Sequence, residues 1–416
     1  MIKKIILPVF LLLVTLLIAF LAVRKPIAEK YNRKGMENYQ KSEYRLAEKY
    51  FRRALQWKGN SPVMHVNLIK TLLAEDKTGE AETQLKKLAD ISPENNELIA
   101  LRGQLMVLED RFAEAVEQLT LAIKKDSLLS YAYYYRGIAR ANLNDLDGAA
   151  EDYLKARDLD KENINVLKEG AMILSKLEDY DAAIENYNKL LELDPSNTEA
   201  FLNRGNFKMK ILDFEGAIKD YSDALTLDDK LAEAYFNRGK SYANTEAYES
   251  AIGDFERTTK LKFKIAGANF NSGLASLKLN RPGEAKKYLN NCIKYDTGLT
   301  HTAEAYYLLG VMEMMQNKNE KALAYYNKSL EYDRDRADTY YNRGIAHGLL
   351  NKPREAIDDL NKCLRLGMNS ADVYFALGVQ KISMNNFADG CGDLKTAAEM
   401  GHRQASDMRL QYCKNH

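Results

Sequence analysis

A recurrence with a period of 34 residues runs through this chain and limits its possible folds more than any other feature. The clearest copy is Thr198–Leu231, in which the spacing of apolar residues predicts two helices of about a dozen residues, joined by a turn at Leu212–Asp213. We expect the small residues Gly205 and Ala217 to let the two backbones approach closely, with Tyr221 filling the space beside them. One such hairpin leaves an apolar face uncovered, so it needs a neighbour of the same kind.

Such neighbours fill most of the chain. They divide residues 28–403 into eleven units, and every step is 34 residues except one, where Thr300–Thr302 are inserted. The eighth place is glycine in nine units, the twentieth is alanine in ten, and the twenty-fourth is large and apolar in all eleven. The units begin at Ala28, Pro62, Asn96, Ser130, Ile164, Thr198, Ala232, Ala266, Ala303, Ala337 and Ala371.

This arrangement of two small residues and a large apolar one resembles the tetratricopeptide repeat (TPR), over residues 28–404. The resemblance implies an all-α fold, a right-handed superhelical α-solenoid of eleven helix pairs whose first helices line a concave groove. Residues 404–416 are predicted to form a capping helix that covers the last pair.

The first residues have a different character. Residues 1–4 form a short basic tail, and only Pro8 and Thr15 depart from strong hydrophobicity in the 19 residues from 5 to 23. At ~1.5 Å per residue, a helix of this length is just long enough to cross a bilayer core. A cleaved signal peptide and a buried core helix are the alternatives, but no A-x-A cleavage pattern precedes Arg24 and Lys25. The sequence therefore predicts an uncleaved transmembrane anchor.

The orientation of this anchor is less constrained. The two lysines before it favour a cytoplasmic N-terminus, while the basic residues after it favour the opposite. We expect a single-pass protein of the bacterial inner membrane with its array in the periplasm. An array that faces the cytoplasm, or export after signal cleavage, remains an alternative.

The four cysteines bear on this location. Cys292 and Cys363 take the twenty-seventh place of their units, where other units have alanine, and we interpret them as small core residues. Cys391 takes a place that packs toward the following helix, which Cys413 ends. A disulfide between these two would fasten the cap to the last repeat and would need an oxidising compartment. Two unrelated thiols are the alternative.

Charged residues also recur within the repeat. Arginine precedes the glycine in five units, and the twenty-third place is aspartate in four of these. We expect each pair to bridge the two helices of its own hairpin, partly buried, and to fix register more than it adds stability, because desolvation offsets the attraction. Shared ancestry without contact is the alternative. The four pairs are Arg136–Asp152, Arg204–Asp220, Arg238–Asp254 and Arg343–Asp359.

Large apolar residues cluster at the places that the resemblance assigns to the groove. This lining suits an extended peptide or an amphipathic helix. The alternative is that the aromatic rings pack against the next unit. The candidate groove residues are Tyr134, Phe236, Phe270, Tyr307, Val311, Met314, Tyr341, Ile345, Phe375 and Val379.

Other function classes find little support. The 60 basic and 59 acidic residues nearly cancel, which argues against a nucleic-acid surface. The resemblance also raises the carboxylate clamp of chaperone adaptors, a binding site that needs lysine at set places. Glu233 and Gly267 stand at such places here, so we do not expect this clamp. No phosphate loop, nucleophile elbow or metal-ligand spacing occurs, so we expect no enzyme, no cofactor, no metal and no small-molecule substrate.

These observations predict a membrane-anchored scaffold or adaptor that binds a protein or peptide partner in its groove, in bacterial envelope assembly or secretion. A structural subunit that joins a membrane complex through its convex face is one alternative. An adaptor that faces the cytoplasm and recruits soluble enzymes is another.

Overall fold

The computed structural model describes residues 3–413, apart from the side chains of residues 3–14 and 16–21. Within residues 3–413 every regular element is a helix, which confirms the all-α class. The chain divides into two compact units, Met1–Ile211 and Leu212–His416, which we call the N-unit and the C-unit.

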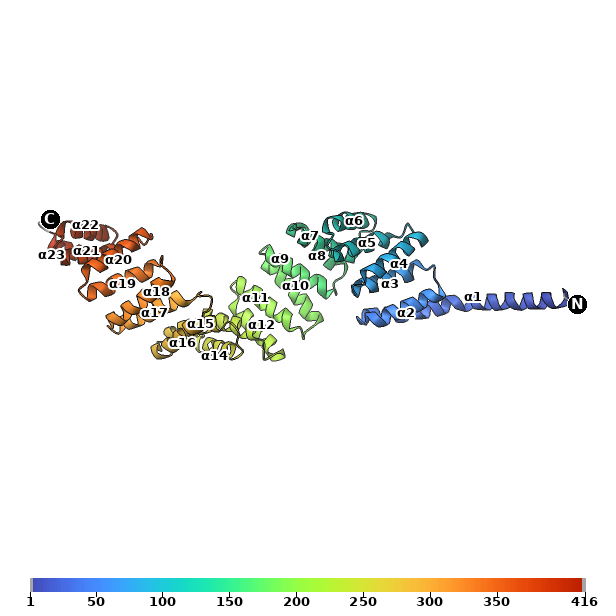
Figure 1. Ribbon diagram of the computed structural model, residues 1–416, viewed down its shortest axis with the longest axis horizontal. Helices are drawn as coiled ribbons and strands as arrows, with labels where there is room; N and C mark the ends of the chain where they lie inside the picture. Colours follow the sequence, from blue (N-terminus) through green and yellow to red (C-terminus); the bar gives the residue numbers. More distant parts are fainter. Residues whose placement is uncertain (1–2, 414–416) are drawn as a thin grey trace. The chain divides into compact units, whose positions relative to one another are not determined.

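The helices of each unit follow one another along the chain (Figure 1). The N-unit holds α1 (Lys3–Gln40), α2 (Tyr44–Trp57), α3 (Pro62–Ala74), α4 (Thr78–Ile91), α5 (Asn96–Leu108), α6 (Phe112–Lys125), α7 (Ser130–Asn142), α8 (Leu146–Leu159), α9 (Ile164–Lys176), α10 (Tyr180–Leu193) and α11 (Thr198–Lys210). The C-unit holds α12 (Phe214–Leu227), α13 (Ala232–Asn244), α14 (Tyr248–Lys260), α15 (Ile265–Lys278), α16 (Pro282–Tyr295), α17 (Thr302–Met315), α18 (Asn319–Tyr332), α19 (Ala337–Leu349), α20 (Pro353–Arg365), α21 (Ala371–Ser383), α22 (Phe387–Glu399) and α23 (Arg403–Tyr412).

Within each of these two compact parts, each helix packs against its neighbours in sequence. In the N-unit α3 packs on α4 and α5, and α5 packs on α6 and α7. In the C-unit α17 packs on α18 and α19, and α19 packs on α20 and α21. Contacts that run only from one hairpin to the next are the mark of a helical solenoid. The division into eleven folding units stays our proposal, since the boundary between the two compact units separates α11 from α12.

The core of each hairpin depends on the small residue at the eighth place. A Cβ atom added to Gly310 would lie 2.5 Å from the ring of Tyr326, and one added to Gly239 would lie 2.8 Å from the ring of Phe255. Both rings are fully buried. The missing side chain therefore provides the space that the large residue of the second helix fills.

The turn between the two helices of a hairpin also repeats. One residue in each turn adopts a left-handed conformation, with φ between 55° and 64°, although none of these residues is glycine. In two of the N-unit hairpins an aspartate then caps the second helix, since Asp145 accepts from the backbone N–H of Gly148 and Asp179 from that of Ala182. The turn residues are Ser42, Asp76, Asp110, Asn144, Glu178, Leu212, Glu246, Asn280, Asn317, Asn351 and Asn385.

The predicted membrane anchor needs correction. Residues 5–23 fall at the start of α1, where most side chains lie outside the described part of the chain. Among the described residues no helix is long and apolar enough to cross a membrane. The described side chains of α1 soon include Arg24, Lys25 and Glu29, which interrupt any uncharged stretch. The predicted location as a single-pass inner-membrane protein is therefore wrong.

Candidate protein-interaction surfaces

The aromatic residues at the fifth place are mostly engaged in packing. Phe236 is 9% exposed and meets Phe255 and Phe263 edge to face, while Lys264 lies over its ring. Phe270 is 7% exposed and stacks on His301 with 4.8 Å between ring centroids. These two rings hold the following loop in place and present little surface to a partner.

The later fifth-place rings are half-buried. Arg336 lies 4.8 Å from the ring centroid of Tyr307, and His402 stacks on Phe375 with 4.1 Å between centroids. Tyr341 and Ile345 pack beside the buried cluster of α20 and α21. Val311 and Met314 pack beside the buried ring of Tyr326, and Val379 is also half-buried. Part of each side chain stays accessible, so their role in binding remains a prediction.

One cavity of the C-unit is lined mainly by apolar side chains. It has a volume of about 320 Å³ and lies between the end of α15, the start of α16 and one side of α17. Met315 lines this cavity and is 81% exposed. Val311 is the one candidate groove residue that reaches it. Its lining is Leu277, Asn280, Arg281, Pro282, Leu308, Val311, Met312, Met315 and Gln316.

Tyr134 lines a separate cavity of the N-unit. This cavity has a volume of about 300 Å³ and also takes in Tyr153, Glu169 and Met172. The ring of Tyr134 meets those of Tyr135 and Tyr153 edge to face. Burial raises the pKa of Tyr134 to about 12, so its hydroxyl stays protonated and can donate a hydrogen bond.

Three of the four predicted arginine–aspartate pairs form bidentate ion pairs in the structure. Their N–O distances lie between 2.6 and 2.9 Å, and the aspartate side chains are 2 to 9% exposed. Arg204 belongs to the N-unit and Asp220 to the C-unit, so that pair stays a prediction. The three pairs are Arg136–Asp152, Arg238–Asp254 and Arg343–Asp359.

These arginines make a further contact that the sequence analysis missed. The second terminal nitrogen of each one donates to a side-chain oxygen at the twenty-fifth place of the preceding unit, at 2.7 to 3.0 Å. Arg136, Arg238 and Arg343 therefore each fill the cleft between two successive second helices. The acceptors are Thr120 for Arg136, Asn188 for Arg204, Ser222 for Arg238 and Asn327 for Arg343.

The eleventh place supplies further cationic partners for aspartates at the twenty-third place. Arg140 donates to Asp152 at 3.0 Å, and Lys381 forms an ion pair with Asp393 at 2.6 Å. Asp393 is the one aspartate at the twenty-third place of a repeat that has no arginine before its glycine. In this repeat Lys381 provides the positive charge that arginine provides elsewhere. Comparison of the eleventh and twenty-third places along the sequence would have revealed this substitution.

The buried pairs carry a desolvation cost. Burial raises the pKa of Asp254, and the hydrogen bond from Arg238 offsets this effect only in part. The hydrogen bond with Asp254 in turn raises the pKa of Arg238. The pKa of Asp254 therefore stays raised although Arg238 binds it in a bidentate manner. This is consistent with an ion pair that fixes how the two helices align more than it stabilises them.

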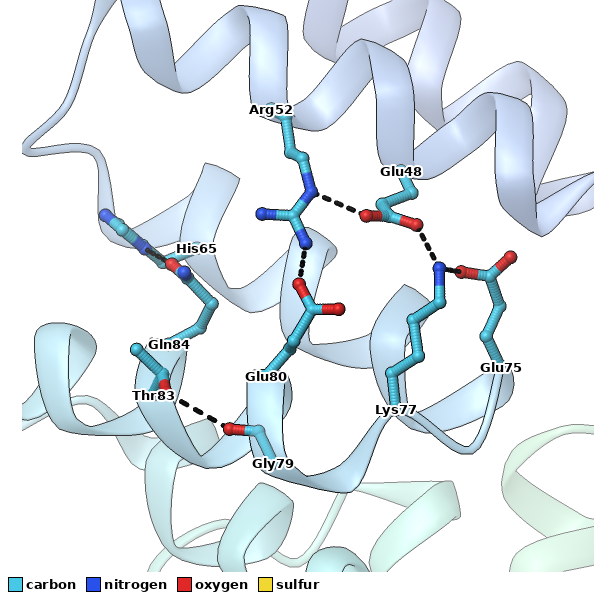
Figure 2. Close-up of polar contacts among 9 residues, drawn as sticks. All are labelled: Glu48, Arg52, His65, Glu75, Lys77, Gly79, Glu80, Thr83 and Gln84. Carbon is cyan, nitrogen blue, oxygen red and sulfur yellow. Dashed lines mark hydrogen bonds and ion pairs between the residues drawn. The ribbon is translucent and has the colours of Figure 1, made fainter.

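A different polar network occupies the first hairpins of the N-unit (Figure 2). Glu48 accepts hydrogen bonds from Arg52 and from Lys77, both at 2.5 Å, and Arg52 also donates to Glu80. Burial works to raise the pKa of Glu48, but the hydrogen bonds from Lys77 and Arg52 outweigh it and hold the pKa at about 2. Beside this network lies a cavity of about 540 Å³ between α2 and α4.

The cysteines separate into the two predicted groups. Cys292 and Cys363 are buried free thiols, and burial raises the pKa of each to about 12, so neither is a nucleophile at neutral pH. Cys391 of α22 is joined by a disulfide to Cys413, which follows α23. Within the described residues no group of three or more His, Cys, Asp or Glu could hold a metal ion.

Family models of the repeat match much of the chain. Those described as TPR repeat match residues 173–210, 213–245 and 310–351. Those described as tetratricopeptide repeat match residues 107–164, 232–264, 266–298 and 337–366. Together they cover more than half of the chain. No curated protein sequence matches it.

Several solved structures are similar. The C-terminal part of a TPR repeat-containing protein from Cytophaga hutchinsonii is 18% identical, with a TM-score of 0.51 over 58% of this chain and 98% of that one, and it shows the fold alone. MamA is 26% identical, with a TM-score of 0.39 over 40% of this chain and 90% of that one. YrrB, a TPR protein with an unusual peptide-binding site, is 23% identical, with a TM-score of 0.39 over 45% of this chain and 95% of that one. The last two TM-scores are too low to support an argument.

The hairpin geometry, the stacking of neighbours and the repeat models all agree. They make this chain a scaffold for protein–protein interaction. The chain belongs to the tetratricopeptide repeat family.

Proposed function

We propose that this scaffold binds an extended segment of a partner protein, and that an apolar side chain of that segment inserts between α15 and α17. The observation that carries this proposal is the exposed Met315 at the rim of the 320 Å³ cavity. Apolar concavities with a few polar groups are the usual form of a side-chain binding site. The proposal involves no catalytic step, cofactor or metal.

The lining of the cavity fits such an occupant. Leu277, Leu308 and Val311 form an apolar wall, and removing one aliphatic side chain from water there would contribute roughly 1.5–3 kcal/mol. Met312 and Met315 have flexible thioether side chains, which adapt to ligands of different shape. The polar rim groups of Asn280 and Gln316 can donate to the backbone of the segment and fix its direction.

The experiment is photo-crosslinking in cells, with a benzophenone amino acid placed at Leu308. The same chain carries either Met315→Glu or the matched control Leu349→Glu. Met315 and Leu349 both take the thirteenth place of their units and are 81% and 60% exposed, but only Met315 lines the cavity. A charge beside the apolar wall should abolish the adduct, while the control should leave it intact.

The proposal predicts one partner segment in the adduct, with an apolar residue at the crosslinked position. Loss of the adduct in both variants, or its persistence with Met315→Glu, would refute insertion at this cavity. An adduct that maps to many unrelated proteins would also count against a specific site.

A further inference from the structure

The cleft between successive second helices takes two forms in the N-unit. Between α6 and α8 it is filled by Arg136, which links Thr120 at the twenty-fifth place to Asp152 at the twenty-third. Between α2 and α4 the corresponding seventh place is Leu68, whose short side chain leaves the cavity of about 540 Å³. The other residues differ as well, since the twenty-fifth place is Arg52 and the twenty-third is Gln84.

These replacements reverse the chemistry of the cleft. The filled cleft offers an acid and a hydroxyl oxygen to a cation. The open cleft instead offers the guanidinium of Arg52, with Lys87 on its edge, and Asp90 is the one acid that lines it. Cationic and N–H donors in a partly desolvated cleft favour a carboxylate.

Arg52 keeps one nitrogen for such a ligand. Its Nε donates to Glu48 and its Nη2 to Glu80. Figure 2 shows the third nitrogen on the side of His65 and Gln84, with no hydrogen bond drawn to it. The guanidinium is therefore fixed by two acids while its remaining donors face the cavity.

Gln84 is fixed in a similar way. Its side-chain amide lies 3.0 Å from Nδ1 of His65, and Gly59 O lies 2.9 Å from Nε2 of the same ring. Gln84 is 8% exposed and His65 is 5% exposed, so both are held rigidly at the base of the cleft. In a neutral ring Nε2 donates to Gly59 O, so Nδ1 accepts, and the amide nitrogen of Gln84 donates to it. Gln84 therefore fixes the base of the cleft, while Arg52 and Lys87 are the donors that a ligand meets.

We propose that the cleft between α2 and α4 binds a carboxylate side chain from an acidic segment of a partner protein. This site is separate from the apolar cavity between α15 and α17, so either proposal can fail without the other. The two together would let one scaffold hold an acidic segment in its N-unit and an apolar one in its C-unit.

Binding of fluorescein-labelled hexaglutamate to the full chain, measured by fluorescence anisotropy at low salt, tests this inference. Hexaglutamine is the matched peptide control, and it should show no saturable binding. Lys87→Gln removes a cation at the edge of the cleft, and Lys49→Gln removes an exposed cation of α2 that does not line it. We expect Lys87→Gln to weaken binding about tenfold and Lys49→Gln by less than about twofold.

A second variant fills the cleft between α2 and α4 in the way that Arg136 fills the cleft between α6 and α8. Leu68→Arg, Gln84→Asp and Arg52→Thr together reproduce the residues found at Arg136, Asp152 and Thr120. With circular dichroism unchanged, this triple variant should lose saturable binding of hexaglutamate. Retention of binding in a folded triple variant would overturn the proposal.

Other outcomes are equally decisive. Equal losses with Lys87→Gln and Lys49→Gln would mean diffuse attraction to a basic surface and would contradict a built site. Displacement of the peptide by millimolar inorganic phosphate, with the same dependence on Lys87, would overturn the choice of an acidic peptide over a phosphate group.

Discussion

The clefts between α2 and α4 and between α6 and α8 are built from the same kind of helix, yet one is open and the other is filled. In the second, Arg136 joins Thr120 and Asp152 and is 12% exposed. In the first, a cavity of about 540 Å³ takes the place of the guanidinium. Both clefts lie between successive second helices of the repeat, and the side chains at three places of the repeat differ.

The difference separates two tasks of the repeat. The eighth, twentieth and twenty-fourth places build the hairpin, and most units share them. The seventh, twenty-third and twenty-fifth places decide whether the cleft to the next hairpin is closed by an arginine. The α2–α4 cleft belongs to a unit that departs from the common pattern at Leu68, Ile69 and Gln84 while keeping Ala81 and Leu85 in the core.

The largest effect on stability should come from removing the aspartate of a cleft that an arginine fills. Asp254 has Arg238 as its one described cationic partner, so Asp254→Ala leaves a largely buried guanidinium without its acid. We expect a loss of about 3 kcal/mol in the free energy of unfolding, measured by hydrogen exchange in α13 and α14.

The matched double variant Arg238→Met with Asp254→Ala removes both charges. It should lose less than Asp254→Ala alone, because no buried charge is left unpaired. Equal losses for the single and double variants would contradict a desolvated ion pair in the filled cleft.

The next effect tests the packing of a small residue against a large one inside a hairpin, which is common to most repeats. Gly310→Ala would bring a Cβ atom to 2.5 Å from the ring of Tyr326, so we expect a loss of about 1–3 kcal/mol from overpacking. Gly253→Ala is the control, because nothing lies within 4 Å of its added Cβ, and it should stabilise α14 by up to about 1 kcal/mol. Similar results for the two variants in denaturant unfolding would show that the eighth place is not sterically special.

The polar network beside the open cleft should make its stability depend on pH. Glu48 has a pKa of about 2 in the folded chain, below the ordinary value of 4.5. Its contribution is therefore present above pH 4.5 and is lost as the pH falls toward 2. Glu48→Gln should cost roughly 1–2 kcal/mol at pH 7, with the difference shrinking across that window.

Trp57, the single tryptophan, ends α2 and gives a fluorescence signal for unfolding of this region. A penalty for Glu48→Gln that stayed constant from pH 7 to pH 2 would exclude an ionised Glu48 as the hub of the network.

The smallest effect concerns the contact between two neighbouring repeats in the cleft between α6 and α8. Thr120→Val removes the hydroxyl that accepts from Arg136 but keeps the shape of the side chain. Because Thr120 is exposed, water can replace the lost acceptor, and we expect a loss of about 0.5 kcal/mol. Hydrogen exchange in α7 that changed as much as with loss of Asp152 would show that the twenty-fifth place matters more than we infer.

The sequence predicted the parts of the fold that depend on short-range sterics. The glycine at place eight and the ring at place twenty-four belong to one hairpin, so their spacing alone indicated that they meet, as Gly239 and Phe255 do. The same holds for Arg136 and Asp152. Contacts between neighbouring repeats, such as that of Arg136 with Thr120, depend on how two hairpins stack. The period of the sequence does not specify this stacking.

Other features lay beyond the reach of the pattern. The fifth-place rings Phe236 and Phe270 were assigned to a groove, but the residues that cover them, Lys264 and His301, come from irregular loops. Hydropathy alone led to the membrane location that the described residues contradict. Thr198–Leu231 is the most regular copy of the repeat, yet the division between the compact units falls inside it.

Side chains at three places of the repeat decide whether the cleft between second helices is closed. A crystal structure of the triple variant Leu68→Arg, Gln84→Asp, Arg52→Thr would show this. We predict that the introduced guanidinium lies within hydrogen-bonding distance of both the introduced carboxylate and the introduced hydroxyl, with the cavity between α2 and α4 gone. An introduced arginine that points into solvent beside an open cavity would contradict it.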